Sequence, residues 1–367
     1  MRRAPARSRT SQIVSTSEQR PLLAHTKEEL KERVVALGGK PFHARIARDS
    51  LFAGARSYDD MTSLPKQLRD ALAEELPLLS AELRLMTHAS DGATKLLLGF
   101  PGRDEGSDEV ETVHIPPHNR RSPKGATLCV STQVGCPVAC PFCASGLAGL
   151  VRNLKAHEIL EQFLRGMEVG PIGRAVVMGI GEPLLNYKEV RAALDVVNQE
   201  LGLGTRKVTL STVGFPERVR EIAQTSPPFQ LAISLHTPFD AERDVLVPAM
   251  KGVPIENVLS AGDFWFKKTG REITYEYVLL GDHNDTPDHA YELGQRLRGR
   301  RANVNLIPWN PLGPQIGDPA MPNYRRPRTE VVAGFQADLE EAGVITTVRW
   351  SRGLESDAAC GQLRLHS

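Results

Sequence analysis

The chain has 367 residues and a formal net charge of +1, with 41% hydrophobic and 24% charged residues. This ordinary globular composition excludes wholesale disorder and collagen-like repeats, and the length suggests about two domains. No run of about 18 apolar residues occurs, so we expect no membrane span. The first 20 residues are rich in arginine, but no apolar segment follows, which argues against a secretory signal. Because the net charge is near zero, any interaction with nucleic acid must rest on local basic patches.

The first 125 residues lack a regular alternation of strands and helices. Residues 1–24 show no periodicity and are predicted to form a disordered basic arm. Residues 25–80 carry three helical patterns and are predicted to form a small helical domain. Residues 81–125 contain a hairpin pattern around Ser90-Asp91-Gly92 and a further strand pattern at 111–115, so we expect a β-hairpin linker region.

From residue 126 onward, short apolar runs alternate with amphipathic stretches. Strands are predicted at residues 127–134, 175–180, 208–212, 229–235, 273–280 and 303–309. Helices are predicted at residues 156–167, 188–201, 216–223, 255–268 and 288–298, and a last helix and strand at 329–341 and 345–350. This alternation indicates an α/β fold with a parallel sheet, and six units fit a partial (β/α)6 barrel over residues 126–350. Residues 351–367 follow as a C-terminal tail, and the loops after the strands are expected to carry the chemistry.

The cysteines are unevenly distributed. Four lie within fifteen residues, at Cys129, Cys136, Cys140 and Cys143, and Cys360 stands seven residues before the C-terminus. An odd count without a secretory signal favours metal binding or catalysis over a disulfide scaffold. The spacing Cys136-x3-Cys140-x2-Cys143 can direct three thiolates from one loop at one centre. Two interpretations compete: a structural zinc, with Cys129 as fourth ligand, or a [4Fe–4S] cluster with one open iron.

Glycine or polar residues follow the other predicted strands, at Gly179-Ile180-Gly181-Glu182-Pro183, Ser211, Ser234-Leu235-His236 and Asn310. Each alone is typical of a loop cap, but together with the cysteine spacing they resemble the radical SAM superfamily. The resemblance implies a [4Fe–4S] cluster on Cys136, Cys140 and Cys143, whose open iron binds S-adenosylmethionine (SAM). It further implies that SAM is reduced to a 5′-deoxyadenosyl radical. The matching cofactor-binding residues are Gly181, Glu182, Ser211, Ser234, Leu235, His236 and Asn310.

Longer segments resemble the RlmN/Cfr family, whose members methylate an adenine in RNA. They are residues 127–136, 152–154, 179–186, 233–238 and 305–311, and the ending Asp357-Ala358-Ala359-Cys360-Gly361-Gln362-Leu363. The resemblance runs from about Thr26 to Leu363. It implies methylation of adenine C2 in 23S ribosomal RNA, at the peptidyl-transferase centre, in transfer RNA, or in both. Val134, where a cysteine would indicate the C8-methylating branch, favours the C2 branch.

The same resemblance assigns the remaining cysteines. Cys360 matches the residue that accepts a methyl group from one SAM, while a second SAM supplies the radical, so two are used per turnover. The methyl carbon then joins the adenine and links protein to RNA. Cys129 matches the thiol that resolves this adduct through a transient disulfide with Cys360, which suits a reducing cytoplasm. Glu111 matches the proton acceptor, with Cys129 as an alternative base; without the resemblance, both would be interpreted as structural strand residues.

Local basic runs lie at residues 118–124, 267–271, 296–301 and 324–328 and could follow RNA phosphates. The target base would have to leave its stack to react. The helical domain is an RNA-reader candidate by family analogy. The family also implies a monomer and a flavodoxin-type electron donor. His283, Asp285, Asp288 and His289 are interpreted as a helix start capped by Asp285 or Asp288, not as a second metal site.

The sequence departs from the family pattern at Ala144-Ser145-Gly146, in a long loop at 116–126 and in a short tail. The loop and the tail bear on RNA specificity. Two other hypotheses stay open. A radical SAM enzyme acting on a peptide or small molecule would need neither Cys360 nor Cys129. An RNA-binding protein with a structural metal would not cleave SAM.

Overall fold

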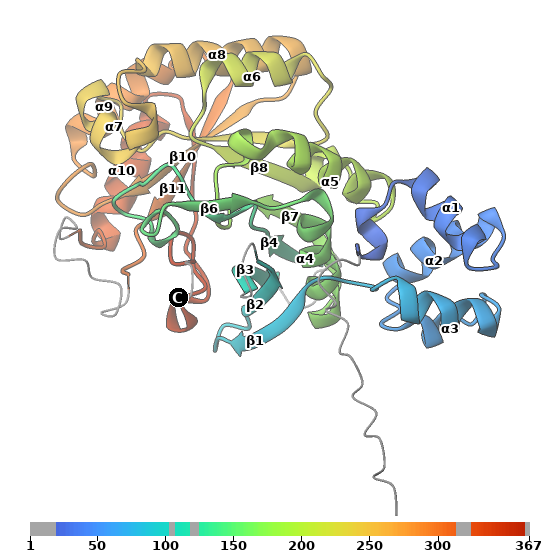
Figure 1. Cartoon of the computed structure of the whole chain (residues 1–367). Helices are drawn as coiled ribbons and strands as arrows, with labels where there is room; N and C mark the ends of the chain where they lie inside the picture. The colour runs from blue at the N-terminus through green and yellow to red at the C-terminus, as the bar shows by residue number, and fades with distance from the viewer. Residues whose placement is uncertain (1–19, 103–106, 118–124, 313–323, 364–367) are drawn as a thin grey trace, which may run out of the picture. The chain divides into compact units, whose positions relative to one another are not determined.

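The computed structural model describes residues 20–102, 107–117, 125–312 and 324–363 (Figure 1). The chain divides into two compact units, one of residues 1–50 and 55–80 and the other of residues 51–54 and 81–367. No helix in the described ranges combines the length and the apolar character that a membrane crossing requires.

The first unit is built from α1 (Lys27–Ala36), α2 (Pro41–Phe52) and α3 (Lys66–Glu75). A capping box begins α1: Thr26 Oγ1 accepts from the Glu29 N–H at 3.1 Å, and the Glu29 carboxylate accepts from the Thr26 N–H at 2.8 Å. The unit begins earlier than the sequence predicts. Leu22 and Leu23 are buried in a 3-10 turn, and the Leu22 N–H donates to the Pro77 carbonyl. Only residues 1–19 of the expected arm lie outside the described residues.

The second unit is organised around one ten-stranded sheet. The strands, in spatial order, are β1 (Glu82–His88), β2 (Thr94–Pro101), β3 (Ser107–Ile115), β4 (Ala126–Cys129), β7 (Ile172–Val177), β8 (Val208–Thr212), β9 (Gln230–Ser234), β10 (Ile273–Leu279), β11 (Ala302–Pro308) and β12 (Ile345–Val348). From β4 to β12 every pair is parallel, and from β1 to β4 every pair is antiparallel. The predicted partial barrel is confirmed, with β12 as an added parallel strand.

Helices connect the parallel strands and surround the outside of the curved sheet (Figure 1). They are α4 (Ala156–Val169), α5 (Tyr187–Gln199), α6 (Pro216–Ala223), α7 (Asp240–Leu246), α8 (Ile255–Thr269), α9 (Pro287–Leu297) and α10 (Thr329–Glu341). Among them, α7 is absent from the sequence prediction, because seven residues are too short to establish a helical period.

Two predicted elements differ from the structure. The expected hairpin linker is part of the main sheet, because β3 pairs with β4 and places Val113 opposite Cys129. The strand expected at residues 127–134 is divided: β4 ends at Cys129, and β5 (Gln133–Gly135) pairs with β6 (Leu150–Asn153) in a separate two-stranded sheet. Gly135 adopts a φ of 75°, a left-handed conformation that turns the chain into the cysteine loop.

Candidate active site

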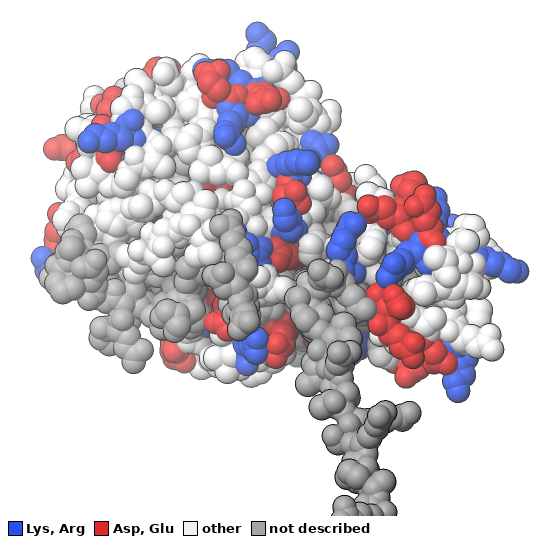
Figure 2. Space-filling view, in the orientation of Figure 1, with Lys and Arg blue, Asp and Glu red and all other residues white. Residues whose placement is uncertain are grey.

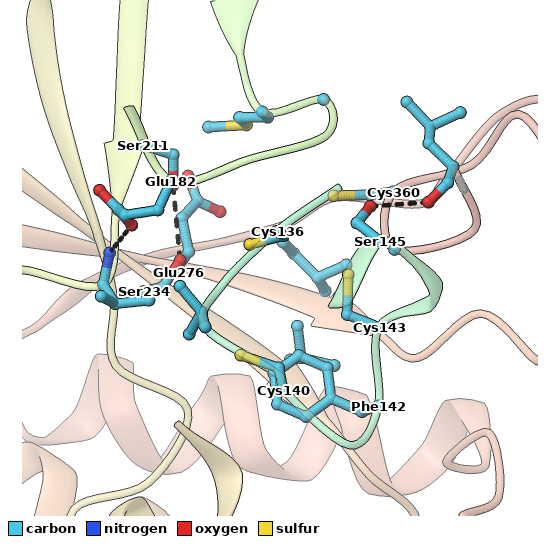
Figure 3. Close-up of a pocket in the computed structure, with 18 of the residues that line it drawn as sticks. Cys136, Cys140, Phe142, Cys143, Ser145, Glu182, Ser211, Ser234, Glu276 and Cys360 are labelled. Carbon is cyan, nitrogen blue, oxygen red and sulfur yellow. Dashed lines mark hydrogen bonds between the residues drawn. The ribbon is translucent and has the colours of Figure 1, made fainter. Parts of the chain in front are cut away.

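A cavity lies where the parallel strands end, and it encloses about 990 Å³ when the solvent at its mouth is included. A cavity of this size can hold a cofactor. Most of the predicted cluster and cofactor residues line it: Cys136, Cys140, Cys143, Gly181, Glu182, Ser211, Ser234, His236 and Asn310, with Cys360 among them (Figure 3). Leu235 is the exception, since its side chain is fully buried outside this lining and its N–H donates to the Glu276 carbonyl.

The cysteine loop, residues 136–143, is fixed by its backbone. The Cys136 N–H donates to the Gly149 carbonyl at 2.9 Å, and the Cys143 N–H donates to the Cys140 carbonyl at 3.1 Å. Trp309, just after β11, donates from Nε1 to the Phe142 carbonyl at 2.9 Å. The three thiol side chains extend from this single loop, as Figure 3 shows. The loop is thus held against the end of β11 before any cofactor binds.

The three loop thiols need a cationic partner in order to ionise. Burial raises the pKa of Cys136 to about 12. Burial and the neighbouring Cys143 and Cys136 raise that of Cys140 well above its usual value. Burial also raises the pKa of Cys143. A bound metal reverses this preference, because a coordinating thiol is deprotonated outright. The donor set therefore fits a metal-containing group.

Zinc and an iron–sulfur cluster make different demands on the three loop thiols. Within the described part of the chain, no three His, Cys, Asp or Glu side chains are placed to hold a single metal ion. Zinc, with Zn–S bonds of about 2.3 Å, requires its ligands around one point. The thiolates of a cluster bind separate irons and can stand further apart.

Glu182, which follows β7, is hydrogen-bonded to the end of β8. Its carboxylate accepts from the Leu184 N–H at 2.9 Å, from Thr212 Oγ1 at 2.6 Å and from the Val213 N–H at 2.9 Å. Burial raises its pKa, and these hydrogen bonds oppose the rise. The family resemblance implies that Glu182 takes part in cofactor binding. In the structure both carboxylate oxygens already accept hydrogen bonds from the chain.

The ends of β8, β9 and β10 complete the wall. Ser211 Oγ and Ser234 Oγ lie 3.4 Å apart. His236 adopts a left-handed φ of 68°, and its Nδ1 accepts from the Val278 N–H at 3.1 Å. Sequence reasoning missed Glu276, which is buried in β10, lines the cavity and accepts from Asn305 Nδ2 at 2.6 Å. The available signal was a carboxylate inside an otherwise apolar buried strand.

The C-terminal tail brings Cys360 into this cavity. Asn310 Nδ2 donates to the Cys360 carbonyl at 2.9 Å, so this predicted cofactor residue also positions the tail. Residues just after the cysteine loop also hold the tail. The Ala144 N–H donates to the Gly361 carbonyl at 2.8 Å, and Ser145 Oγ donates to the Leu363 carbonyl at 2.6 Å (Figure 3). Cys360 has accessible surface, and two cavities share it.

The second cavity encloses about 930 Å³ including its mouth, and both Cys129 and Cys360 line it. Two thiols 231 positions apart in sequence therefore meet at one site, and all five cysteines are free. Burial raises the pKa of Cys129 to about 12 and that of Cys360 to about 11. The nearby Arg349 guanidinium opposes both increases. Arg349 is a second residue that sequence reasoning missed.

Glu111 lies on the same sheet face as Cys129. Val113 is paired with Cys129 across β3 and β4, and Glu111 is two residues before Val113 on the same strand. Glu111 is buried, and its Oε1 lies 2.8 Å from Lys95 Nζ. It is not among the residues that line either cavity. Lys95 also donates to the Asp357 carbonyl at 3.2 Å, a connection to the tail that no local pattern indicated.

The histidine–aspartate segment after β10 is a helix start, but the predicted cap was wrong. Thr286 is the N-cap of α9, with its Oγ1 accepting from the His289 N–H. Asp285 instead accepts from the Asp282 N–H at 2.9 Å. His289 Nε2 lies 2.9 Å from Glu242.

Acidic partners neutralise most of the basic run at residues 296–301. Arg296 pairs with Glu292, and Arg301 with Glu272. Arg300 pairs with both Glu256 and Asp263. On the face drawn in Figure 2, basic and acidic side chains of the described residues are interspersed. The run at 118–124 lies outside the described residues, so the expected phosphate contacts there are a prediction.

Comparisons with known proteins agree with this geometry. The family model described as the radical SAM superfamily matches residues 130–294. A "Probable dual-specificity RNA methyltransferase RlmN" of Rhodopirellula baltica is 43% identical over 350 residues, covering 94% of this chain and 90% of the relative. The protein of the same name from Thermosynechococcus vestitus is 42% identical, covering 94% and 98%. The crystal structure of a radical SAM methyltransferase from Sphaerobacter thermophilus has a TM-score of 0.83 and 37% identity, covering 93% and 98%.

Proposed function

The chain belongs to the RlmN family of radical SAM RNA methyltransferases, and from this premise we propose that it methylates C2 of an adenine in RNA. The proposed substrates are 23S ribosomal RNA at the peptidyl-transferase centre and, as the dual specificity in its relatives' name suggests, transfer RNA. One observation carries the proposal most directly: Cys360 lines both cavities, and Cys129 meets it in the second.

The family uses a [4Fe–4S] cluster and SAM, and Cys136, Cys140 and Cys143 would hold the cluster here. When bound, the pair supplies a 5′-deoxyadenosyl radical. SAM would bind at the ends of the parallel strands, near Gly181 and Ser211. The cavity wall would also exclude water from the reacting atoms, because its lining comes from buried strand ends and the cysteine loop.

Cys360 has the central role among the chain's own residues. Its sulfur accepts a methyl group from SAM, S-adenosylhomocysteine leaves, and the thiol proton is lost. The radical would remove one hydrogen atom from the S-methyl group, and the resulting carbon would add to adenine C2. Loss of the ring proton and of one electron, returned to the cluster, would then leave the Cys360 sulfur linking protein and RNA. The Cys129 thiolate then attacks that sulfur: a disulfide forms, the carbon–sulfur bond breaks, and its electron pair takes up a proton from the protonated base to give a new C–H bond. Glu111, or Cys129 as the alternative, accepts the proton from the ring.

Several finer properties belong to the same proposal. The Cys129–Cys360 disulfide would be transient and would be reduced again in a cytoplasmic environment. By analogy with the family, we propose a flavodoxin-type electron donor and a monomeric enzyme. The helical unit would read RNA shape, residues 126–350 would form the catalytic barrel, and residues 351–367 the catalytic tail.

The test is a comparison of three forms of the anaerobically purified enzyme: wild type, Cys360→Ala and Cys129→Ala. Each is incubated with SAM, reductant and protein-free ribosomal RNA, and the digested RNA is analysed by mass spectrometry. Wild type should yield 2-methyladenosine. Cys360→Ala should yield none while still cleaving SAM, and Cys129→Ala should accumulate a protein–RNA adduct that slows RNA migration in a denaturing gel.

The control is the double variant Cys129→Ala/Cys360→Ala, which should give neither product nor adduct. Methylation by Cys360→Ala would overturn the proposed route. A signal of 8-methyladenosine would reassign the carbon, and SAM cleavage with unmodified RNA would direct the search to transfer RNA and then to other substrates.

A further inference from the structure

We propose that Trp350 is a base-stacking residue that receives an RNA nucleobase at the mouth of the second cavity. This inference rests on the proposed function, because it takes the meeting point of Cys129 and Cys360 as the place where the adenine reacts. Trp350 lines the same cavity as both thiols. It stands two residues after β12, where the chain passes from the sheet into the tail.

The exposure of Trp350 is unusual among the chain's three tryptophans. Trp350 is 46% exposed, whereas Trp265 is fully buried and Trp309 is half-buried, with its Nε1 hydrogen-bonded to the cysteine loop. An indole ring carries a large apolar surface, and folding normally buries most of it. A half-exposed ring in a cavity wall therefore offers surface that a flat apolar ligand can cover.

A guanidinium group lies over the Trp350 ring. The Arg326 Cζ lies 5.8 Å from the centroid of the Trp350 ring, in a cation–π contact. Arg326 is itself held by hydrogen bonds to the Trp309 carbonyl at 3.0 Å and to Asn310 Oδ1 at 2.9 Å. A side chain already held in place loses little conformational entropy when a base stacks on it.

The charge of the cavity selects a nucleic acid rather than an apolar peptide. Arg349 and Arg352 belong to the same lining as Trp350. Arg349 is oriented towards Met178, with its Nη1 3.5 Å from Sδ, and Arg352 donates to the Pro116 carbonyl at 3.2 Å. Guanidinium groups bind phosphate oxygens, and aromatic rings stack on bases of any sequence. An RNA segment supplies both a base and a phosphate.

The experiment separates stacking from charge by using two probes. A fluorescently labelled 12-nucleotide oligoadenylate carries phosphates and bases, and an inorganic polyphosphate of similar length carries the charge alone. Binding of the labelled oligoadenylate to the cluster-loaded enzyme is followed by anisotropy, and binding of polyphosphate by competition. Trp350→Ala should weaken oligoadenylate binding on the order of tenfold and leave polyphosphate binding unchanged. Trp350→Phe, which keeps an aromatic face, should restore most of the affinity.

A second readout reports the contact directly. Oligoadenylate should quench the intrinsic tryptophan fluorescence of the wild type, and Trp350→Phe should lose that quenching although it still binds. Leu354→Ala is the matched control, because Leu354 is a 38% exposed apolar residue of the same tail that is not part of the cavity lining. It should bind both probes like the wild type.

The stacking assignment would be overturned if Trp350→Ala lost affinity equally for oligoadenylate and polyphosphate, or if its affinity for both were unchanged. SAM cleavage and Cys360 methylation are measured on the same preparations, and Leu354→Ala should match the wild type in both. A wild type that binds oligoadenylate through Trp350 yet never forms methyladenosine would support the base site and contradict the proposed reaction. If the enzyme forms methyladenosine but its RNA binding does not depend on Trp350, the proposed reaction is supported and the base site at Trp350 is contradicted.

Discussion

At the scale of single residues, Gly181 shows how closely the cavity wall is built. Its φ is 111°, and a Cβ at this position would come within 2.7 Å of both Gln133 Cβ and Thr132 Oγ1. Gln133 cannot move aside freely, because its Oε1 accepts from the Glu182 N–H at 2.7 Å. The absence of a side chain at Gly181 therefore sets the position of Glu182 and of the strand ends that it joins.

Gly181→Ala should weaken SAM binding about tenfold or more and should destabilise the fold by about 1–3 kcal/mol, the usual cost of such backbone strain. Equilibrium dialysis with SAM and thermal unfolding would measure the two effects. Gly334→Ala is the control, since Gly334 lies in α10 and a Cβ there meets nothing within 4 Å. Normal SAM affinity in Gly181→Ala would contradict this prediction and would show that Gln133 and Thr132 can move to accommodate the added methyl group.

Glu111→Gln tests the proposed proton acceptor. The amide keeps the shape of the side chain but cannot accept the ring proton, so the rate of methyladenosine formation should fall about a hundredfold. Methylation of Cys360 and SAM cleavage should continue, because neither requires this base. If the rate stays at the wild-type value, Cys129 is the better assignment. Single-turnover product analysis by mass spectrometry would distinguish the two.

At the scale of elements, the β1–β2 hairpin supports the catalytic tail. Asp91 Oδ2 accepts from the Gly353 N–H at 2.7 Å, and Lys95 Nζ donates to the Asp357 carbonyl at 3.2 Å. These two contacts bracket the 3-10 turn Leu354–Ser356, shortly before Cys360. The segment that the sequence predicts as a linker thus fixes the backbone on which the reactive thiol stands.

Asp91→Ala and Lys95→Met should each raise the alkylation rate of Cys360 by iodoacetamide several-fold, because the tail loses one of its two anchors on the hairpin. Peptide mass spectrometry follows this one cysteine selectively. Glu82→Gln serves as the control: it removes a charge from the same hairpin, at a side chain that is 63% exposed and pairs with Arg84. Alkylation rates equal to the wild type would refute the supporting role.

At the scale of the whole molecule, a buried neutral histidine makes stability depend on pH. Burial lowers the pKa of His236 from 6.5 to about 3. As the pH falls below 6.5, His236 binds a proton in the unfolded chain but stays neutral in the folded chain. Stability is therefore lost from about pH 6.5 down to about pH 3, by about 1.4 kcal/mol per pH unit. Glu182 and Glu276, whose pKa values are raised by burial, act in the opposite direction.

His236→Asn should reduce this acid sensitivity. Asparagine can accept the Val278 N–H and tolerates the left-handed φ of 68°, but it does not titrate. Urea unfolding midpoints of the cluster-free protein at pH 7 and pH 5.5 would measure the effect. The difference between the two pH values should be smaller in the variant, and equal differences would mean that other groups dominate.

The sequence predicted the barrel well where local signals were clear. The predicted bounds of α6 (Pro216–Ala223), α10 (Thr329–Glu341) and β8 (Val208–Thr212) are those of the structure. A proline at the first position of α6 marks its start. The cysteine spacing indicated the metal loop, and the family resemblance supplied the choice of cluster and the roles of Cys129 and Cys360. Lys95 could not be predicted, because no local pattern encodes a contact with a tail residue 262 positions away. Arg349 could not be predicted either, because its neighbour Met178 is 171 positions away.

The pairing of Val113 with Cys129 has a consequence for how this family can change over time. Side chains alternate across a strand, so inserting or deleting one residue in β3 would turn Glu111 away from Cys129 and bring its neighbour into that place. Substitutions along β3 can accumulate, but a change in its length shifts the register of the side chains beyond it. Gene lineages of this enzyme should therefore vary in length at the connections on either side of β3 and keep the strand itself at constant length.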